Sequence, residues 1–246
     1  MRSLTLLNGQ SSFSEFNRSL CEKLKHRQSK FFGRSQIIYN IGDEAHGLYF
    51  LRGGLVKLNA ISVMGKEIIL DVRGQDETFG ELCLCSRYRE EMAVTMEPSE
   101  IIELNVDDLL AIAREHTEAL RDFLKTFFTQ MARSYNLIRE VSFDTVPERL
   151  AKLLLRLADE FGQQTQTGTE LAHFISQEEL SQIVLARREI VSTALGKLRG
   201  RGLVNYTRKG RLTIQRGALK AYIENGSGQE NDGSLFARKE YAATGD

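Results

Sequence analysis

The sequence predicts an α+β protein in three successive parts: an antiparallel β-roll of the cupin-like jelly-roll type, a long helix, and a unit of short helices with a β-hairpin. Three observations predict this order. Apolar and polar residues alternate from about Ile37 to Leu104, apolar residues recur roughly every 3.5 positions from about Val106 to Val141, and two short helical patterns precede a hairpin pattern between Ser176 and Gln215.

Composition limits the class of protein. With 246 residues, 41% hydrophobic and 27% charged, the chain can bury the core of one large domain or two modest ones. No apolar run approaches the roughly eighteen residues that cross a bilayer, and the N-terminus lacks the apolar stretch of an export signal. We therefore expect a cytoplasmic protein with no membrane anchor.

Residues 1–105 are predicted to form the effector-sensing β-roll domain, which begins with an N-terminal helical lead. Glycines divide the alternating stretch at turn-like intervals; they are Gly42, Gly47, Gly53, Gly54, Gly65, Gly74 and Gly80. Many short strands separated by such turns are typical of a roll or a barrel.

Residues 106–143 are predicted to form a long dimerisation helix and a hinge. Apolar spacings of four and three define a heptad seam of Leu120, Leu124, Phe127, Met131, Ser134, Ile138 and Val141. A second apolar set lies off this seam: Phe123, Phe128 and Tyr135. We expect one face to pack on the roll while the seam contacts a second copy. The alternative is one broad stripe that packs only against its own domain.

Residues 144–224 are predicted to form a separate unit. Thr145 and Glu148 make an S/T-x-x-E capping box with Pro147 in the first turn, which indicates a new helix after the hinge. The last residues, 225–246, are rich in Gly, Ser, Asn and Asp and are predicted to form a flexible tail.

Ser176 and Glu179 form a second capping box, which begins a short helix. After a tight turn, a second helix has an apolar arc of Ile190, Val191, Ala194, Leu195 and Leu198. Its opposite side carries Arg188, Glu189, Ser192, Gly196 and Arg199, with Thr193 at the edge. This is the helix-turn-helix arrangement, in which the second helix enters the DNA major groove. Arg suits the two acceptors of guanine, and Glu can accept from the cytosine amino group.

Positive charge is concentrated around this helix although the whole chain has a net charge of zero. Between Leu185 and Lys220 the only acidic residue is Glu189, against ten basic ones: Arg187, Arg188, Lys197, Arg199, Arg201, Arg208, Lys209, Arg211, Arg216 and Lys220. Such an excess is typical of a surface that binds a polyanion. The hairpin pattern has Arg208, Lys209 and Arg211 at its tip, where a wing would meet phosphates. The alternative is a small helical domain with a solvated basic face.

The order of these parts, and several motifs, resemble the Crp/Fnr family of transcription regulators, over about Phe31 to Ala221. The matching motifs are "GDEAHGLYFLRGGLVKL" (Gly42 to Leu58), "FGEL" (Phe79 to Leu82), "ERLAKLLLRLA" (Glu148 to Ala158) and "RRE" (Arg187 to Glu189). The resemblance implies a cyclic-nucleotide-binding-like β-roll, a dimerisation helix and a winged helix-turn-helix. It also implies a homodimer on a two-fold symmetric site in double-stranded DNA, with RNA polymerase as a further partner.

By this resemblance, Arg188 and Glu189 are the base-reading pair, together with Ser192 and with Thr193, where relatives usually have a further arginine. Ser176 matches a hydroxyl that contacts phosphate in relatives. The predicted phosphate contacts are Ser176, Arg187, Arg199, Arg208, Lys209 and Arg211. The turn departs from the family pattern, because Leu185 stands where glycine is frequent and Arg187 where serine or threonine is frequent.

The roll departs from the cyclic-AMP receptors. In those proteins the segment opened by Gly-Glu-Leu ends in an Arg-Ser pair that binds the cyclic phosphate, and Glu91 and Met92 hold those places here. A carboxylate repels a phosphate, so cyclic AMP is disfavoured. The predicted effector pocket comprises Gly80, Glu81, Leu82, Arg87, Arg89, Glu91 and Met92. Arg87 and Arg89 could bind another anion there, or could simply be solvated.

Other sensing chemistries find little support. Cys21 stands alone near the N-terminus, where an iron–sulfur cluster needs several thiolates. The four histidines are scattered, which disfavours haem or a metal, and no HxH pair of a cupin enzyme occurs. Cys83 and Cys85 are either a thiol switch or small buried hydrophobes. We predict a DNA-binding regulator that is not an enzyme, with an effector other than cyclic AMP or none; the alternative is a small-molecule sensor that acts mainly through protein contacts.

Overall fold

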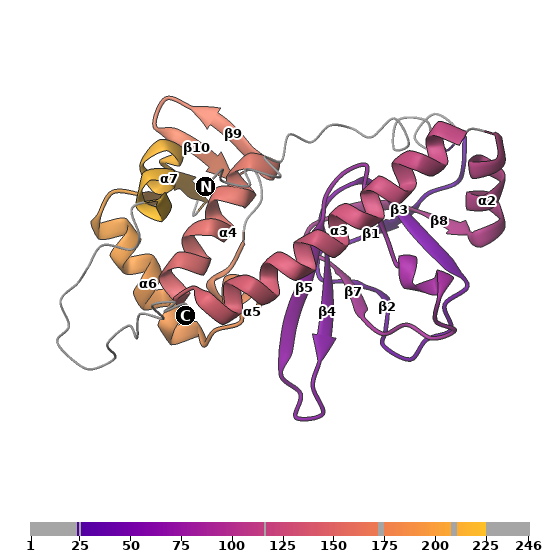
Figure 1. Cartoon of the computed structure of the whole chain (residues 1–246), viewed down its shortest axis with the longest axis horizontal. Helices are drawn as coiled ribbons and strands as arrows, with labels where there is room; N and C mark the ends of the chain where they lie inside the picture. Colours follow the sequence, from indigo (N-terminus) through magenta and orange to yellow (C-terminus); the bar gives the residue numbers. More distant parts are fainter. Residues whose placement is uncertain (1–23, 25, 116, 172–174, 208–210, 225–246) are drawn as a thin grey trace, which may run out of the picture.

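The computed structural model of the chain describes residues 24, 26–115, 117–171, 175–207 and 211–224. A β-roll and a C-terminal helical unit lie at opposite ends of the molecule, and the long helix α3 (Thr117–Phe143) runs from one to the other (Figure 1). The predicted α+β class and its order of parts are confirmed.

Two four-stranded antiparallel sheets form the roll, with strand orders β1-β8-β3-β6 and β2-β7-β4-β5. The strands are β1 (Lys30–Phe32), β2 (Ile37–Tyr39), β3 (Gly47–Gly53), β4 (Val56–Ile61), β5 (Glu67–Arg73), β6 (Thr78–Phe79), β7 (Met92–Thr95) and β8 (Ser99–Asn105). A short 3-10 helix, η1 (Glu81–Leu84), follows β6. Buried side chains from both sheets, including Leu51, Val56, Phe79 and Ile101, fill the space between them. One apolar side of each sheet thus faces the other sheet across this core.

Two helices occupy the segment for which we expected a single helix. The first, α2 (Val106–Glu115), packs against β8 and α3, and α3 itself begins at Thr117. The apolar spacing that we followed back to Val106 therefore belongs to two helices, and only α3 carries the heptad seam.

Two residues, at the predicted hinge, separate the end of α3 from helix α4 (Val146–Phe161). The Glu148 carboxylate accepts from the Thr145 amide at 2.8 Å, as the capping box predicts, and Pro147 lies in the first turn. A local signal, readable from four residues, thus fixes where the C-terminal unit starts.

The C-terminal unit combines four helices with a small antiparallel sheet of order β11-β12-β10-β9, counted over the described residues. Besides α4, it contains β9 (Gly162–Thr165), β10 (Gly168–Leu171), α5 (Gln177–Ile183), α6 (Arg188–Gly200), β11 (Val204–Tyr206), β12 (Leu212–Ile214) and α7 (Arg216–Glu224). The predicted hairpin is confirmed, with Val204 opposite Ile214 and Tyr206 opposite Leu212. Its tip, with Arg208 and Lys209, lies outside the described residues.

The C-terminal unit is packed against the roll. Roll residues such as Leu55 and Val72 share one buried apolar cluster with α4 and α5. A Cβ on Gly74 would lie 2.6 Å from Cε1 of Phe161, so only glycine permits this approach of the roll to α4. Lys57 and Glu179 add an ion pair of 3.9 Å between β4 and α5.

Among the residues that the structure describes, none of the helices is both long enough and apolar enough to span a bilayer.

Candidate functional site

The first helix of the helix-turn-helix, α5, starts at its predicted capping box. The Glu179 amide donates to Ser176 Oγ at 3.2 Å, and the Glu179 carboxylate accepts from the Ser176 amide at 2.8 Å. Ser176 Oγ also donates to that carboxylate. The hydroxyl predicted to contact a DNA phosphate is therefore half-buried and already engaged in the cap.

The turn between α5 and α6 contains two unfavourable positions. Leu185 has a φ of 54°, in the left-handed region, which costs a residue with a side chain roughly 1–2 kcal/mol. Arg187 has the extended conformation of an N-cap but makes no side-chain hydrogen bond to the helix. The backbone strain at Leu185 would be relieved by glycine, which adopts a positive φ at no steric cost. The cap that is missing at Arg187 would be supplied by serine, whose hydroxyl can accept from an amide of the first turn.

We expect Arg187→Ser to change stability and DNA binding in opposite directions. Serine at this N-cap can accept from an amide in the first turn of α6, which stabilises by about 1 kcal/mol. Loss of the basic side chain should weaken binding to every DNA sequence and reduce the slope of log affinity against log salt by about one unit. Thermal unfolding and DNA titrations at several salt concentrations measure the two effects.

Arg187→Ala is the matched control, because it removes the same charge without supplying a cap. It should lose the same DNA affinity and show no gain in melting temperature. Equal melting temperatures for the two variants would show that α6 gains nothing from a cap, and an unchanged salt slope would remove Arg187 from the phosphate contacts.

Helix α6 has one buried and one exposed side. Val191, Ala194, Leu195 and Leu198 are buried, as predicted. Ile190, which we placed in the same arc, is 47% exposed, because it lies at the edge of the arc, about 90° from its centre. The exposed side carries the four predicted base-reading residues: Arg188, Glu189, Ser192 and Thr193.

Some of the predicted DNA-contacting residues already have a partner within the chain, and others are exposed. Thr193 Oγ1 donates to the Glu189 carbonyl oxygen at 2.9 Å within α6, so its hydroxyl proton is already used. Arg211 pairs with Glu170 of β10 at 3.3 Å, which offsets part of its charge. Arg187 and Arg199 are exposed. Among the predicted base-reading residues, Thr193 is therefore a weaker candidate than Arg188 and Glu189, whose side chains are exposed.

A cavity of about 330 Å³ lies where the roll, α3 and the C-terminal unit meet. Leu58 and Ile69 line it from the roll, Met131 from α3, and Leu153 and Leu157 from α4. Because all three parts contribute walls, a molecule bound here would contact the roll, α3 and α4 together.

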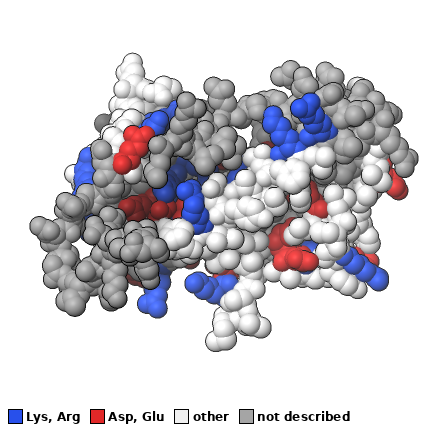
Figure 2. Space-filling model, viewed as in Figure 1, with Lys and Arg blue, Asp and Glu red and all other residues white. Residues whose placement is uncertain are grey.

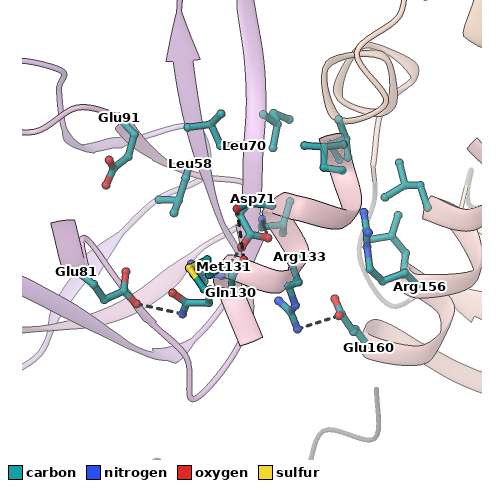
Figure 3. A pocket seen from close by; sticks show the side chains of 18 of the residues that line it. Leu58, Leu70, Asp71, Glu81, Glu91, Gln130, Met131, Arg133, Arg156 and Glu160 are labelled. Atoms are coloured by element: carbon teal, nitrogen blue, oxygen red, sulfur yellow. Dashed lines mark hydrogen bonds and ion pairs between the residues drawn. The ribbon is translucent and has the colours of Figure 1, made fainter. Parts of the chain in front are cut away.

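Charged groups in and beside the cavity are largely paired with one another. Arg133 of α3 bonds to Glu160 of α4 at 3.1 Å and lies 3.9 Å from Glu77 of the roll. In Figure 3, Arg133 points toward Glu160 and Gln130 toward Glu81. Burial raises the pKa of both Glu77 and Glu160, and nearby arginines oppose the shift. Arg73 pairs with Asp71 but leaves its buried Nε without a hydrogen-bond partner.

Only three residues of the predicted effector pocket line this cavity: Glu81, Leu82 and Glu91. Arg87 is exposed and pairs with Glu44 at 3.1 Å, and Met92 is buried in β7. The other lining residues come from β4, β5, α3, α4 and α5. These residues share no sequence motif, so their place in one cavity becomes clear only when the distant elements are packed together.

Arg89 has a role that its position in the sequence does not predict. It is 4% exposed, and its guanidinium donates to the carbonyl oxygens of Gly80 at 2.9 Å and Gly47 at 2.5 Å. Its guanidinium carbon lies 4.3 Å from the Tyr39 ring centroid and 5.2 Å from that of Tyr49. Arg89 is therefore bound within the roll rather than directed into the cavity.

Glu91 is 4% exposed, and its carboxylate accepts from the Tyr39 hydroxyl at 2.9 Å. Burial raises the pKa of Glu91; the Tyr39 hydrogen bond and the charge of Arg89 oppose the shift, while Glu81 and Glu90 add to it. The folded protein thus binds this proton more tightly than the unfolded chain. The resulting stability is full below the unfolded pKa and is lost as pH rises through the folded pKa.

We expect Glu91→Gln to raise the melting temperature more at pH 8 than at pH 5. The amide oxygen can still accept from Tyr39, and the cost of a buried charge is removed at the higher pH. Glu103→Gln, a change at an exposed carboxylate of β8 that pairs with Lys30, is the control. A lower melting temperature for Glu91→Gln at pH 8, or a difference independent of pH, would contradict this assignment.

One broad apolar stripe on α3 is exposed in the single chain. It comprises Leu124, Phe127, Phe128, Met131, Tyr135, Ile138 and Val141. We expected Phe128 and Tyr135 to pack on the roll, but they are 54% and 62% exposed on the same side as the seam. The side chains of Leu120 and Phe123 lie outside the described residues. Figure 2 shows mostly uncharged side chains over the middle of α3.

The remaining candidate groups are two thiols, one within the 3-10 helix η1 and one just after it. Cys83 is half-buried and Cys85 is exposed, and burial raises the pKa of Cys83. A raised pKa lowers the thiolate fraction and hence the reactivity of Cys83. Within the described ranges, no cluster of three or more His, Cys, Asp or Glu residues could hold a metal ion.

Comparison with known proteins agrees with this arrangement. Residues 29–116 match the family model of the cyclic nucleotide-binding domain, and residues 148–222 match the Crp-like helix-turn-helix domain. A roll of this type joined to such a helix-turn-helix defines a DNA-binding transcription regulator.

The chain is 30% identical over 181 residues to the CRP-like cAMP-activated global transcriptional regulator of Mycobacterium tuberculosis, covering 73% of this chain and 81% of that protein. It therefore belongs to the Crp/Fnr family of transcription regulators, which are not enzymes. It is 26% identical over 181 residues to the global nitrogen regulator of Synechocystis, covering 72% and 80%. A CRP-family regulator from Thermus thermophilus superimposes with a TM-score of 0.68 at 27% identity, covering 79% of this chain and 96% of that one.

Proposed function

We propose that two copies of the chain form a dimer through α3, and that each inserts α6 into one major groove of a two-fold symmetric DNA site. The observation that carries this proposal is the two-sided character of α6. Its buried side is held by Val191, Leu195 and Leu198, while Arg188 and Glu189 are exposed in its first turn. The two half-sites then lie about 34 Å apart, one turn of the duplex.

Each part of the chain has a place in this proposal. Residues 1–105 form the sensor domain, 106–143 the dimer helix and hinge, and 144–224 the DNA-binding domain, followed by a tail over 225–246. The wing, with Arg208, Lys209 and Arg211, contacts phosphates beside the half-site. The dimer acts in the cytoplasm on double-stranded DNA, with RNA polymerase as the further partner.

The effector, where one acts, differs from cyclic AMP. Relatives of similar identity are named for different signals, cAMP activation in one and nitrogen regulation in another, so similarity alone does not select a ligand. The residues of this chain argue against cyclic AMP, because Glu91 stands where the cyclic-AMP receptors have an arginine for the phosphate and Arg89 is bound to backbone carbonyls. Among the described residues, four carboxylates line the cavity against three arginines, and two of these arginines, Arg73 and Arg133, pair with Asp71 and Glu160, so an anionic phosphate entering here would meet an excess of acidic groups.

DNA binding by the full-length protein tests the proposal. A site is enriched from random-sequence duplexes and then compared with a scrambled duplex by gel shift. We expect a dissociation constant on the order of 10⁻⁸ M for the enriched site at physiological salt, and binding that weakens steeply as salt rises. Thermal unfolding with and without cyclic AMP should give the same melting temperature.

Failure to enrich any sequence would contradict DNA-binding regulation. It would leave the sensor that acts through protein contacts as the better interpretation. A rise in melting temperature with cyclic AMP would contradict our interpretation of Glu91.

A further inference from the structure

Arg199, one of the predicted phosphate contacts, lies at the end of α6 away from Arg188. The guanidinium carbon of Arg199 lies 5.2 Å from the ring centroid of Tyr206 on β11. Arg199 is exposed, and within the described part of the chain no carboxylate pairs with it. Its charge is therefore available to a partner, while the Tyr206 ring restrains its side chain.

Arg199 and Tyr206 face a groove of about 670 Å³ between the C-terminal half of α6 and the wing strands. Arg199 is the only charged residue in its lining as the structure describes it, and the other side chains include Asn205 and Thr207. A groove lined by one cation, by hydroxyl and amide side chains and, within the described residues, by no carboxylate suits an anion with hydrogen-bond acceptors, as a DNA phosphate is.

The groove opens onto the predicted base-reading side of α6. Gly196 lies between Ser192 and Arg199 on that side and lines the groove. A Cβ at Gly196 would meet no atom within 4 Å, so packing within the chain does not require glycine there. Glycine inside a helix costs roughly 0.5–1 kcal/mol relative to alanine, yet it leaves room for a close approach from outside.

We infer that this groove binds a phosphate of the DNA backbone through Arg199, and that Tyr206 is the positioning residue for that contact. The inference rests on the proposed DNA-binding function. Stacking on the ring holds the planar guanidinium in a limited range of orientations, which reduces the conformational entropy lost when the phosphate binds. The contact adds affinity without reading sequence.

Tyr206→Leu in the full-length protein tests the role of the ring. We expect binding to weaken about two- to fivefold, equally on the enriched and the scrambled duplex, as loss of an exposed cation–π contact predicts. Arg199→Ala should reduce the salt slope by about one unit. With alanine already at 199, Tyr206→Leu should have no further effect on DNA affinity. Tyr206→Phe, which keeps the ring, should bind as the unchanged protein does.

Tyr222→Leu is the matched control. Tyr222 of α7 stacks under Arg201 at 5.4 Å, and like Tyr206 it packs against the core of the C-terminal unit, but it does not line the groove. Tyr222→Leu should alter the thermal stability and leave the slope of log DNA affinity against log salt unchanged. Independent effects of Tyr206→Leu and Arg199→Ala, or unaltered binding by Tyr206→Leu, would overturn the inference. Absence of DNA binding by the unchanged protein would overturn the proposed function instead.

Discussion

Arg188→Ala is expected to weaken binding to the enriched DNA site by about 1–3 kcal/mol and to relax the choice of base at one position of each half-site. Arg188 is the first residue of α6 and is exposed, so its guanidinium can reach the O6 and N7 acceptors of a guanine. Alanine leaves the buried side of α6 unchanged. Titrations with duplexes that carry each of the four base pairs at that position measure both effects.

Lys197→Ala is the matched control for this loss of charge. Lys197 lies on the same helix and is exposed, but it is about 180° around the axis from Arg188. Its removal should leave the ratio of affinities for the preferred and scrambled duplexes unchanged. If Arg188→Ala also kept that ratio, Arg188 would have no part in base reading.

The DNA-binding side of the molecule could be predicted from the sequence because its signals are local. The capping boxes at Thr145 and Ser176 fixed the starts of α4 and α5 within a few residues. The apolar arc of α6 is confirmed except at Ile190, which lies at the edge of the arc, where periodicity does not decide whether a side chain is buried. The hairpin formed by β9 and β10 was missed, because its strands are short, polar and without an alternating pattern.

The sensor side could not be predicted to the same extent, because its contacts join residues far apart in the chain. Arg89 resembles an exposed loop residue in the sequence, yet Tyr39 and Tyr49, fifty and forty positions earlier, enclose it. The cavity likewise depends on how α4 and α5 pack against β5. Hydrophobic periodicity tells which side of a strand or helix is buried, but not which distant element covers it.

Ile138→Glu is expected to convert the proposed dimer into a monomer and to weaken binding to the symmetric site by a factor on the order of 10² or more. Ile138 is 63% exposed in the single chain and lies in the apolar stripe of α3. In a two-fold dimer each copy would bring a carboxylate into an apolar interface, where an unpaired charge is strongly unfavourable. Separate copies lose the gain in affinity that comes from linking two half-site contacts. Light scattering and titration of whole-site and half-site duplexes measure these effects.

Asn136→Glu adds the same charge to the other side of α3 and serves as the control. Asn136 Oδ1 accepts from Arg139 at 3.3 Å, and a carboxylate there can accept the same hydrogen bond. This variant should stay dimeric and bind the whole site. The half-site affinity of Ile138→Glu should equal that of the unchanged protein, because α6 is not altered. A dimeric Ile138→Glu with full affinity would show that the α3 stripe is not the interface, and Arg188 would then have to reach a symmetric site through some other pairing of the two chains.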